Sequence, residues 1–153
     1  MLKELEKLSA SEVELMMKAP LLVCILIAGA DSEIDKNEIK GAIGLAKKGK
    51  VIGSLAEYYK EVAEDFEDKL KVLLRALPKE SSSRNQFVVE ELSQLNLILP
   101  KMKKSVATDF YKSLRYIAKK IAETSGGVLG MKAVGEKEMQ FLGLSMIMDP
   151  GSS

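Results

Sequence analysis

The sequence predicts an all-α protein, a single-domain bundle of six or seven helices. Apolar residues recur at spacings of three and four residues along almost the whole chain, as in amphipathic helices, and no segment alternates as a half-buried strand does. The chain has 153 residues, 46% of them hydrophobic. A chain of that length buries about 68–70% of the surface that it exposes when unfolded. We therefore expect one domain over residues 1–153, with its core at about 11–148 and a frayed tail at 149–153.

The first long helix is expected to begin near Ser11 and to continue into the apolar run from Ala19 to Ala30. Overlapping serine-x-x-acid capping boxes indicate its start, because their side chains bind the free backbone N–H groups of a first helical turn. Pro20 should kink this helix or divide it in two. The run has twelve residues, whereas a membrane span needs about twenty. It therefore predicts a buried core helix with Cys24 as a small hydrophobic side chain, and no transmembrane segment.

The other helices follow from capping residues, prolines and glycines. Asp35 and Glu38 form a further capping box, Pro78 ends a long helix, and Pro100 opens one at its first position. A glycine-rich link at 125–130 precedes the last helix. Four of the expected helices lie at about 35–48, 54–77, 87–99 and 136–148. A fifth begins at Pro100 and follows an apolar stripe as far as Ile121, and a polar linker is expected at 79–85.

Two of these predicted helices carry charges of one sign on the side opposite their apolar stripe. Each charged side is either the solvated back of a bundle helix or a surface that docks a partner of opposite charge. The basic side has neither interleaved aromatic residues nor a glycine-rich phosphate loop, so we expect no nucleic-acid partner. The acidic residues are Glu57, Glu61, Glu64, Asp65 and Asp68, and the basic residues are Lys101, Lys104, Lys112, Arg115 and Lys119.

The composition excludes several kinds of active site. The absence of histidine rules out serine–histidine and cysteine–histidine catalysis and any imidazole metal ligand. A single cysteine rules out an intramolecular disulfide and a multi-cysteine zinc site. The net charge of +1 is too balanced to indicate a nucleic-acid or membrane partner. We expect a protein that is not an enzyme, and, since the N-terminal residues lack the apolar stretch of a secretory signal, a cytoplasmic one.

Four carboxylates lie within eight residues in the turn that follows the apolar run, at Asp31, Glu33, Asp35 and Glu38. Helix capping accounts for Asp35 and Glu38. If Asp31 faces Asp35 at about 5 Å, their repulsion is about 1–3 kcal/mol, and either the positive N-terminus of the next helix or a bound cation would offset it. Oxygen ligands favour the hard divalent cations Ca²⁺, Mg²⁺ and Mn²⁺. The turn is therefore a candidate metal site.

A second turn, at residues 127–138, aligns with the first. The alignment places Val134 against Ile34 and Glu138 against Glu38. Two helices that start with similar capping chemistry would share this pattern by convergence. The alternative is an internal pseudo-repeat, in which two equivalent turns lie at the same end of the bundle and Glu138 joins Asp31, Asp35 and Glu38 as a candidate metal ligand.

The segment from Pro20 to Glu38 resembles the first signature of the TerB-like (tellurite-resistance TerB) domain family, which is usually an apolar helix, then Ala-Asp-Gly-x-Ile, then an acid and a glutamate. Ser32 stands here where the family generally has glycine. The late segments Ile121–Gly130 and Val134–Glu138 resemble its second signature. This resemblance covers about residues 11–147. It implies an all-helical cytoplasmic domain without established catalytic activity, in a family associated with tellurite resistance and stress response. The family's metal-binding acids would correspond to Asp31, Asp35, Glu38 and Glu138.

Two functions are consistent with this sequence. The first is a non-enzymatic binding or sensing module that holds a divalent cation in the acidic turn. The second is a protein–protein interaction scaffold, in which the acidic side at 57–68 and the basic side at 101–119 dock partner proteins or other copies of the chain. Salt should weaken the second kind of association, because exposed charges are screened beyond about 10 Å at 0.1 M ionic strength.

Overall fold

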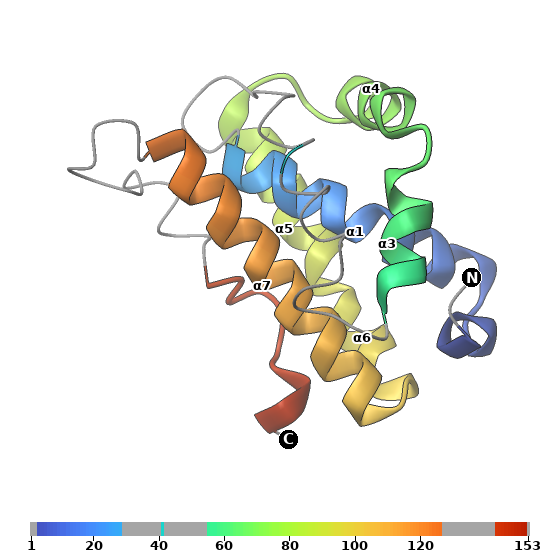
Figure 1. The fold of residues 1–153 in the computed structure, drawn as a ribbon. Coiled ribbons are helices and arrows are strands. Elements are labelled where there is room, and N and C mark those ends of the chain that lie inside the picture. Colours follow the sequence, from blue (N-terminus) through green and yellow to red (C-terminus); the bar gives the residue numbers. More distant parts are fainter. Residues whose placement is uncertain (1–2, 29–40, 42–54, 127–142, 153) are drawn as a thin grey trace.

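The fold is an all-α bundle, shown in Figure 1. The computed structural model describes residues 3–28, 41, 55–126 and 143–152, and within these ranges there is no strand. The all-α class predicted from apolar spacing is therefore confirmed. The helices are α1 (Ala10–Ala28), α3 (Ala56–Ala63), α4 (Phe66–Ala76), α5 (Ser81–Ser93), α6 (Leu95–Ile98) and α7 (Lys104–Gly126), with 3₁₀ helices η1 (Lys3–Lys7), η3 (Leu99–Lys101) and η4 (Pro150–Ser152).

Helix α1 lies at the centre of the bundle and packs against α3, α5, α6 and α7. Every residue from Ala19 to Ile27 is buried, as expected for a helix that is apolar on all sides. Cys24 is among them, and burial raises the pKa of its thiol. Across the described ranges, we find no helix whose length and hydropathy together would let it span a bilayer.

The start of α1 is the predicted capping box. The Glu12 backbone N–H donates to Ser9 Oγ at 3.3 Å, and the Ser9 backbone N–H donates to Glu12 Oε1 at 2.9 Å. The helix begins at Ala10, directly after this cap and just before the expected start at Ser11. Pro20 is buried inside α1 and does not divide it. The apolar packing on both sides of Pro20 holds the helix together where proline removes a backbone hydrogen bond.

The helix predicted over 54–77 is wrong as a single element, because it breaks into α3 and α4 at Glu64 and Asp65. Asp65 has φ 52°, in the left-handed region that aspartate tolerates better than most residues. Lys69 Nζ donates to the Glu61 carbonyl oxygen at 2.8 Å, so a lysine of α4 satisfies a backbone acceptor near the end of α3. The hydrophobic period continues across the break, which is why the period did not reveal it.

Helix α5 begins at Ser81, six residues before the expected start at Phe87, so the predicted linker at 79–85 is wrong over most of its length. Glu80 is the N-cap. Its carboxylate accepts from the hydroxyl groups of Ser82 and Ser83, both at 2.7 Å, and from their backbone N–H groups at 3.0 and 3.2 Å. These bonds lower the pKa of Glu80 from 4.5 to about 2. Glutamate is not among the favoured N-cap residues, so the usual capping pattern misses this start.

Two further predictions are corrected at the ends of α7 and of the chain. Pro100 lies in η3, and α7 begins only at Lys104. Residues 143–148 form turns, although a helix was predicted over 136–148, and the rest of that range lies outside the described residues. The segment just before the tail is held by Asn96, whose Nδ2 donates to the Met146 carbonyl at 2.9 Å and whose Oδ1 accepts from the Met148 N–H at 2.7 Å. Within the tail that was expected to fray, Pro150–Ser152 form η4. Helix η4 then packs against α7.

An aromatic cluster joins α3 to α7 in the core. The buried ring of Tyr58 meets Tyr59 edge-on at 4.9 Å and Phe110 edge-on at 5.8 Å between ring centroids. The Tyr58 hydroxyl donates to the Met16 carbonyl of α1. The Tyr59 hydroxyl lies 2.6 Å from Ser113 Oγ, which itself donates to the Phe110 carbonyl at 2.6 Å. Buried hydroxyl groups keep hydrogen-bond partners in this way, which fixes how α3 sits on the bundle.

Candidate functional site

The predicted metal ligands Asp31, Asp35, Glu38 and Glu138 all lie outside the described residues, as do the acidic turn and the second turn at 127–138. The predicted metal site and the pseudo-repeat thus stay predictions. Within the described ranges, no group of three or more cysteine or acidic side chains is arranged to hold a metal ion. The described candidate surfaces are therefore the charged helix sides and two cavities.

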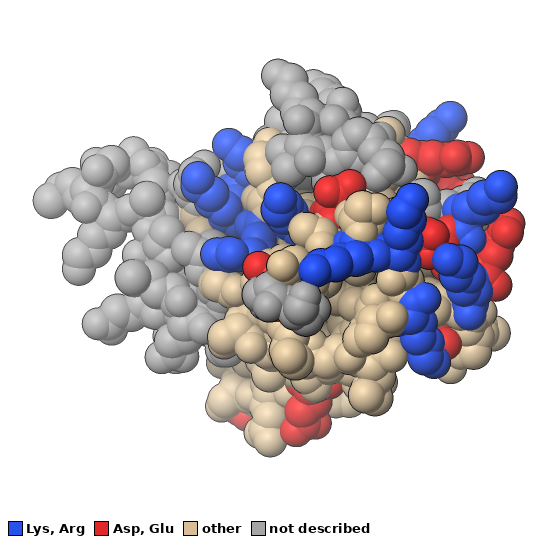
Figure 2. Space-filling view, turned by 90° about the horizontal axis from the view of Figure 1, so that it is seen from below, with Lys and Arg blue, Asp and Glu red and all other residues tan. Residues whose placement is uncertain are grey.

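The exposed side of α7 carries three basic residues in a short row. Lys112, Arg115 and Lys119 are exposed, while Leu114, Ile117 and Ile121 on the other side of the helix are fully buried. At 1.5 Å of rise per residue, the row extends over about 10 Å. We call Lys112, Arg115 and Lys119 the basic face. Figure 2 shows Lys and Arg side chains gathered in a band across one side of the molecule, with acidic side chains between them at several places.

The basic face has little internal neutralisation. Neither Lys112 nor Lys119 forms a hydrogen bond or an ion pair with any part of the chain that the structure describes. The Arg115 guanidinium lies over the Tyr111 ring, 5.8 Å from its centroid, and Lys120 Nζ lies 5.5 Å from the centroid of Tyr116. The ring beside Arg115 is itself buried, and the prediction of no nucleic-acid partner stays a prediction. The four-residue spacing of each tyrosine and its cation could have indicated these contacts.

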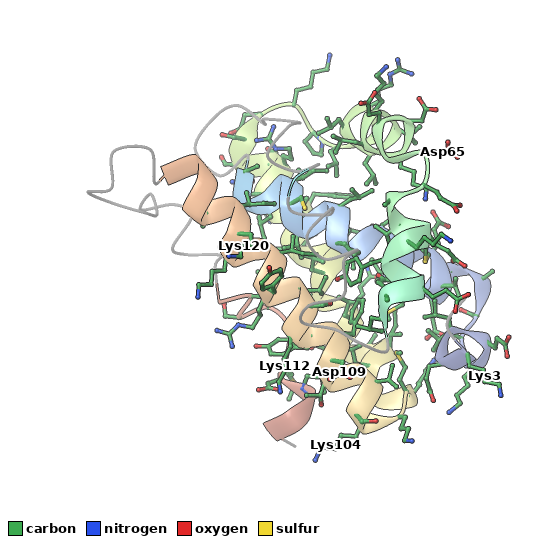
Figure 3. All side chains as sticks on the ribbon, viewed as in Figure 1. Lys3, Asp65, Lys104, Asp109, Lys112 and Lys120 are labelled. Atoms are coloured by element: carbon green, nitrogen blue, oxygen red, sulfur yellow. The ribbon has the colours of Figure 1, made fainter. Side chains whose placement is uncertain are left out.

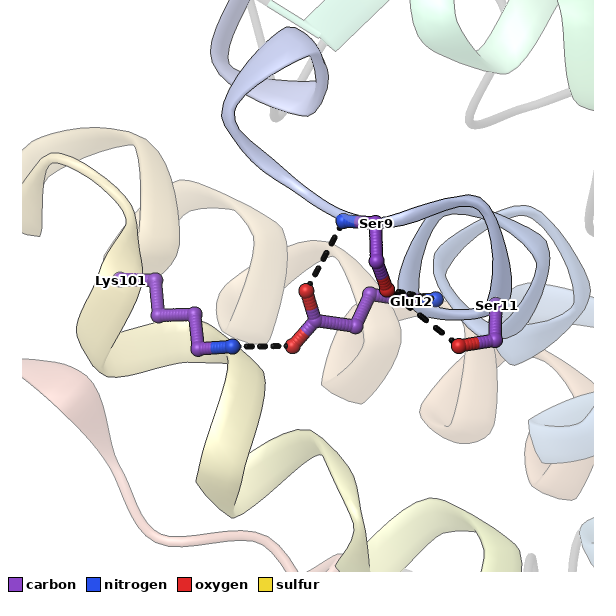
Figure 4. Close-up of polar contacts among 4 residues, drawn as sticks. All are labelled: Ser9, Ser11, Glu12 and Lys101. Atoms are coloured by element: carbon purple, nitrogen blue, oxygen red, sulfur yellow. Dashed lines mark hydrogen bonds and ion pairs between the residues drawn. The ribbon is translucent and has the colours of Figure 1, made fainter.

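Lys101 does not belong to the basic face, although the sequence predicted that it would lie on the basic side of the same helix. It lies on η3 and donates to Glu12 Oε2, while the other carboxylate oxygen of Glu12 takes part in the cap of α1 (Figure 4). The Lys101 ammonium and the Ser9 N–H lower the pKa of Glu12. Lys101 thus ties η3 to the start of α1 and has a structural role.

A similar contact fixes the N-terminal 3₁₀ helix. Glu4 of η1 accepts from the Lys103 backbone N–H at 3.1 Å and pairs with Lys7 at 3.0 Å. The Lys103 N–H and then Lys7 lower the pKa of Glu4. The charged N-terminal segment is therefore attached to the residue that precedes α7.

The predicted acidic side is divided by the break at Glu64 and Asp65. Glu57 and Glu61 lie on α3, whereas Asp68 lies on α4. Four carboxylates gather where the two helices meet, and one of them, Glu67, was not among the acidic residues predicted for this side. All four are exposed, and none forms an ion pair within the described residues. We call this group the acidic corner; it consists of Glu64, Asp65, Glu67 and Asp68.

The acidic corner and the basic face lie on different sides of the molecule. In Figure 3, Asp65 lies at the upper right, where α3 meets α4, whereas Lys112 and Lys120 lie along α7, below the centre and on the left. The two surfaces therefore cannot neutralise each other within one molecule. Among the described residues, no group of opposite charge forms an ion pair with either surface.

Two cavities with mainly apolar walls also lie within the described part of the chain. A groove of about 360 Å³ lies between α1 and α4, with Met17, Leu21, Val72 and Leu73 in its walls and charged side chains at its edges. A cavity of about 280 Å³ lies between η3, the start of α7 and the C-terminal segment, lined in part by Leu99, Met102 and Met148. Both can hold an apolar group, but their walls do not indicate a particular ligand.

Comparisons with models of known protein families, with curated proteins and with solved structures found no match. The resemblance to the TerB-like family thus rests on the segments Pro20–Glu38 and Ile121–Glu138 alone.

Proposed function

We propose that this protein is a non-enzymatic interaction module that binds an acidic partner protein on the basic face of α7. The single observation that carries this proposal is the exposure of Lys112, Arg115 and Lys119 within one short row, without acidic partners in the described part of the chain. Other lysines, such as Lys18 and Lys101, are held by carboxylates of the same molecule. The basic face differs because no carboxylate within the described ranges pairs with its three cations.

The expected binding is modest and depends on salt. One exposed ion pair contributes about 0.2–1 kcal/mol, so three pairs alone give weak affinity. Clustered charges of one sign mainly raise the rate of encounter with an oppositely charged partner and fix its orientation. A partner helix with acids three, four or seven residues apart would match the row, because those positions share one helix face.

The test uses a short helical peptide with glutamates at that spacing, and its glutamine analogue as a ligand control. We expect NMR shift changes to centre on α7 at 20 mM NaCl and to fade at 500 mM. The variant K112Q/R115Q/K119Q should bind at least about tenfold more weakly, which corresponds to 1.4 kcal/mol. The control variant K60Q/K71Q/K79Q removes three exposed lysines elsewhere and should bind like the unchanged protein. Equal losses in both variants would mean that net charge, and not the basic face, governs binding.

A second candidate function is divalent-metal binding in the acidic turn, as the TerB-like resemblance implies. The observation that favours it is the set of four carboxylates at Asp31, Glu33, Asp35 and Glu38, of which capping accounts for only two. In this proposal Asp31, Asp35 and Glu38, with Glu138, bind Ca²⁺, Mg²⁺ or Mn²⁺, and the protein acts as a sensing module in tellurite resistance or stress response.

Titration of the full chain with each cation by calorimetry tests the metal proposal. We expect binding at or below millimolar metal, and loss of that binding in D31N/D35N. The matched control E67Q/D68N removes two carboxylates of the acidic corner and should leave the titration unchanged. No heat of binding with any of the three cations at millimolar concentration would exclude this function.

A further inference from the structure

We propose that the occupant of the basic face is the acidic corner of a second copy of this chain, so that copies associate head to tail. This inference rests on the proposed function, because it uses the same face of α7. It adds the identity of the partner. A complementation experiment distinguishes a failure of self-association from a failure of the proposed function.

The acidic corner has the charge and exposure that the basic face requires. Its four carboxylates lie within five consecutive residues, and all are exposed. The turn at Asp65, with φ 52°, projects this segment at the edge of the bundle. The basic face offers three cations over about 10 Å of helix. Each surface therefore offers several charges of one sign to the other.

The overall charge does not oppose contact between copies. The chain carries 23 basic and 22 acidic residues, so its net charge is +1 and two copies hardly repel each other. Proteins with net charge close to zero associate more readily than highly charged ones. Segregation of the two signs onto different sides of a nearly neutral molecule then favours the orientation in which unlike sides meet.

The position of the two surfaces determines the kind of assembly. A two-fold symmetric dimer would place the same patch of both copies in one interface. Here the contacting patches differ, and they lie on different sides of the molecule (Figure 3). Each added copy thus leaves one free acidic corner and one free basic face. The expected product is a chain of copies that grows with concentration, and not a closed dimer.

Complementation between two variants tests this inference. The face variant K112Q/R115Q/K119Q keeps the acidic corner, and the corner variant E64Q/E67Q/D68N keeps the basic face. The corner variant retains Asp65, because its left-handed backbone restricts substitution there. Sedimentation equilibrium at 20 and 500 mM NaCl gives the average mass, and the control is K60Q/K71Q/K79Q.

At 1 mM protein and low salt, the average mass of the unchanged protein and of the control should be about twice the monomer mass, as expected for a dissociation constant near 1 mM. At high salt, both proteins should return to monomer. Each variant alone should stay monomeric. Their equimolar mixture should form a one-to-one heterodimer, whose average mass never exceeds twice that of the monomer. Restored association in the mixture also shows that each variant retains a folded, intact surface.

Each other outcome overturns the inference. If the unchanged protein stays monomeric at low salt but the basic face binds the acidic peptide, self-association is wrong and the proposed function stands. If the peptide also fails to bind, both are wrong. If either variant still associates alone, or the mixture stays monomeric while the unchanged protein associates, a different surface is responsible.

Discussion

Helices α1 and α7 are held by apolar burial, whereas α4 and the start of α5 are held largely at their ends by polar contacts. In α1, every residue from Ala19 to Ile27 is buried. In α4, Leu70 is the only described side chain that is buried, and Val72 is 64% exposed. The contacts of Lys69 with Glu61 and of Glu80 with Ser82 and Ser83 define where the helices of this second region begin and end. The difference indicates that α1 and α7 provide most of the stability, whereas α4 provides mainly exposed surface.

The largest expected effect comes from truncating one apolar side chain in each region. Leu114 of α7 is fully buried, so Leu114→Ala should lower the free energy of unfolding by about 2–5 kcal/mol. Val72→Ala in α4 should change it by less than about 0.5 kcal/mol. Urea denaturation followed by circular dichroism measures both. Similar losses in the two variants would contradict the contrast between the regions.

The next effect concerns the backbone at Asp65. Valine is strained at φ 52°, so Asp65→Val should lower the free energy of unfolding by about 1–2 kcal/mol, whereas Asp65→Gly should change it by less than about 0.5 kcal/mol. The same urea titrations give these values. Equal stability of the valine and glycine variants would mean that α3 and α4 join into the continuous helix that the hydrophobic period predicts.

The cap of α5 should produce a smaller effect that depends on pH. The pKa of Glu80 falls from 4.5 to about 2 in the folded protein, so its carboxylate stabilises the fold above pH 4.5, and that contribution is lost as the pH falls toward 2. Thermal denaturation between pH 2 and 7 should show that Glu80→Gln lowers the melting temperature at neutral pH and less so near pH 2. Glu6→Gln, at an exposed position of η1, is the control. A loss that does not depend on pH would show that the charge of Glu80 is not responsible.

The same contrast explains which parts of the fold the sequence could predict. The apolar spacing of α1 and α7 reflects burial, and it correctly predicts that α1 is a buried core helix and which side of α7 is buried. The break at Asp65, the early start of α5 and the docking of Met146 and Met148 by Asn96 depend on local backbone geometry and a few polar contacts, which have no sequence period. Of the predicted basic side, four residues lie on α7, but Lys101 pairs with Glu12, a contact across 89 residues of sequence. Such a distant pair leaves no local pattern.

The smallest effect is expected from a polar contact in the region held by burial. Lys101→Gln removes the ion pair with Glu12 but leaves the Ser9 cap of α1 in place. The ion pair between Lys101 and Glu12 is exposed, and α1 is held by its buried residues. At 20 mM NaCl, the urea midpoint of the variant should therefore lie slightly below that of the unchanged protein, and at 1 M NaCl the two midpoints should be equal. Glu12→Gln should behave in the same way, since glutamine can replace glutamate in a capping box. A loss in Lys101→Gln that persists at 1 M NaCl would mean that polar contacts, and not burial alone, also hold the central helix.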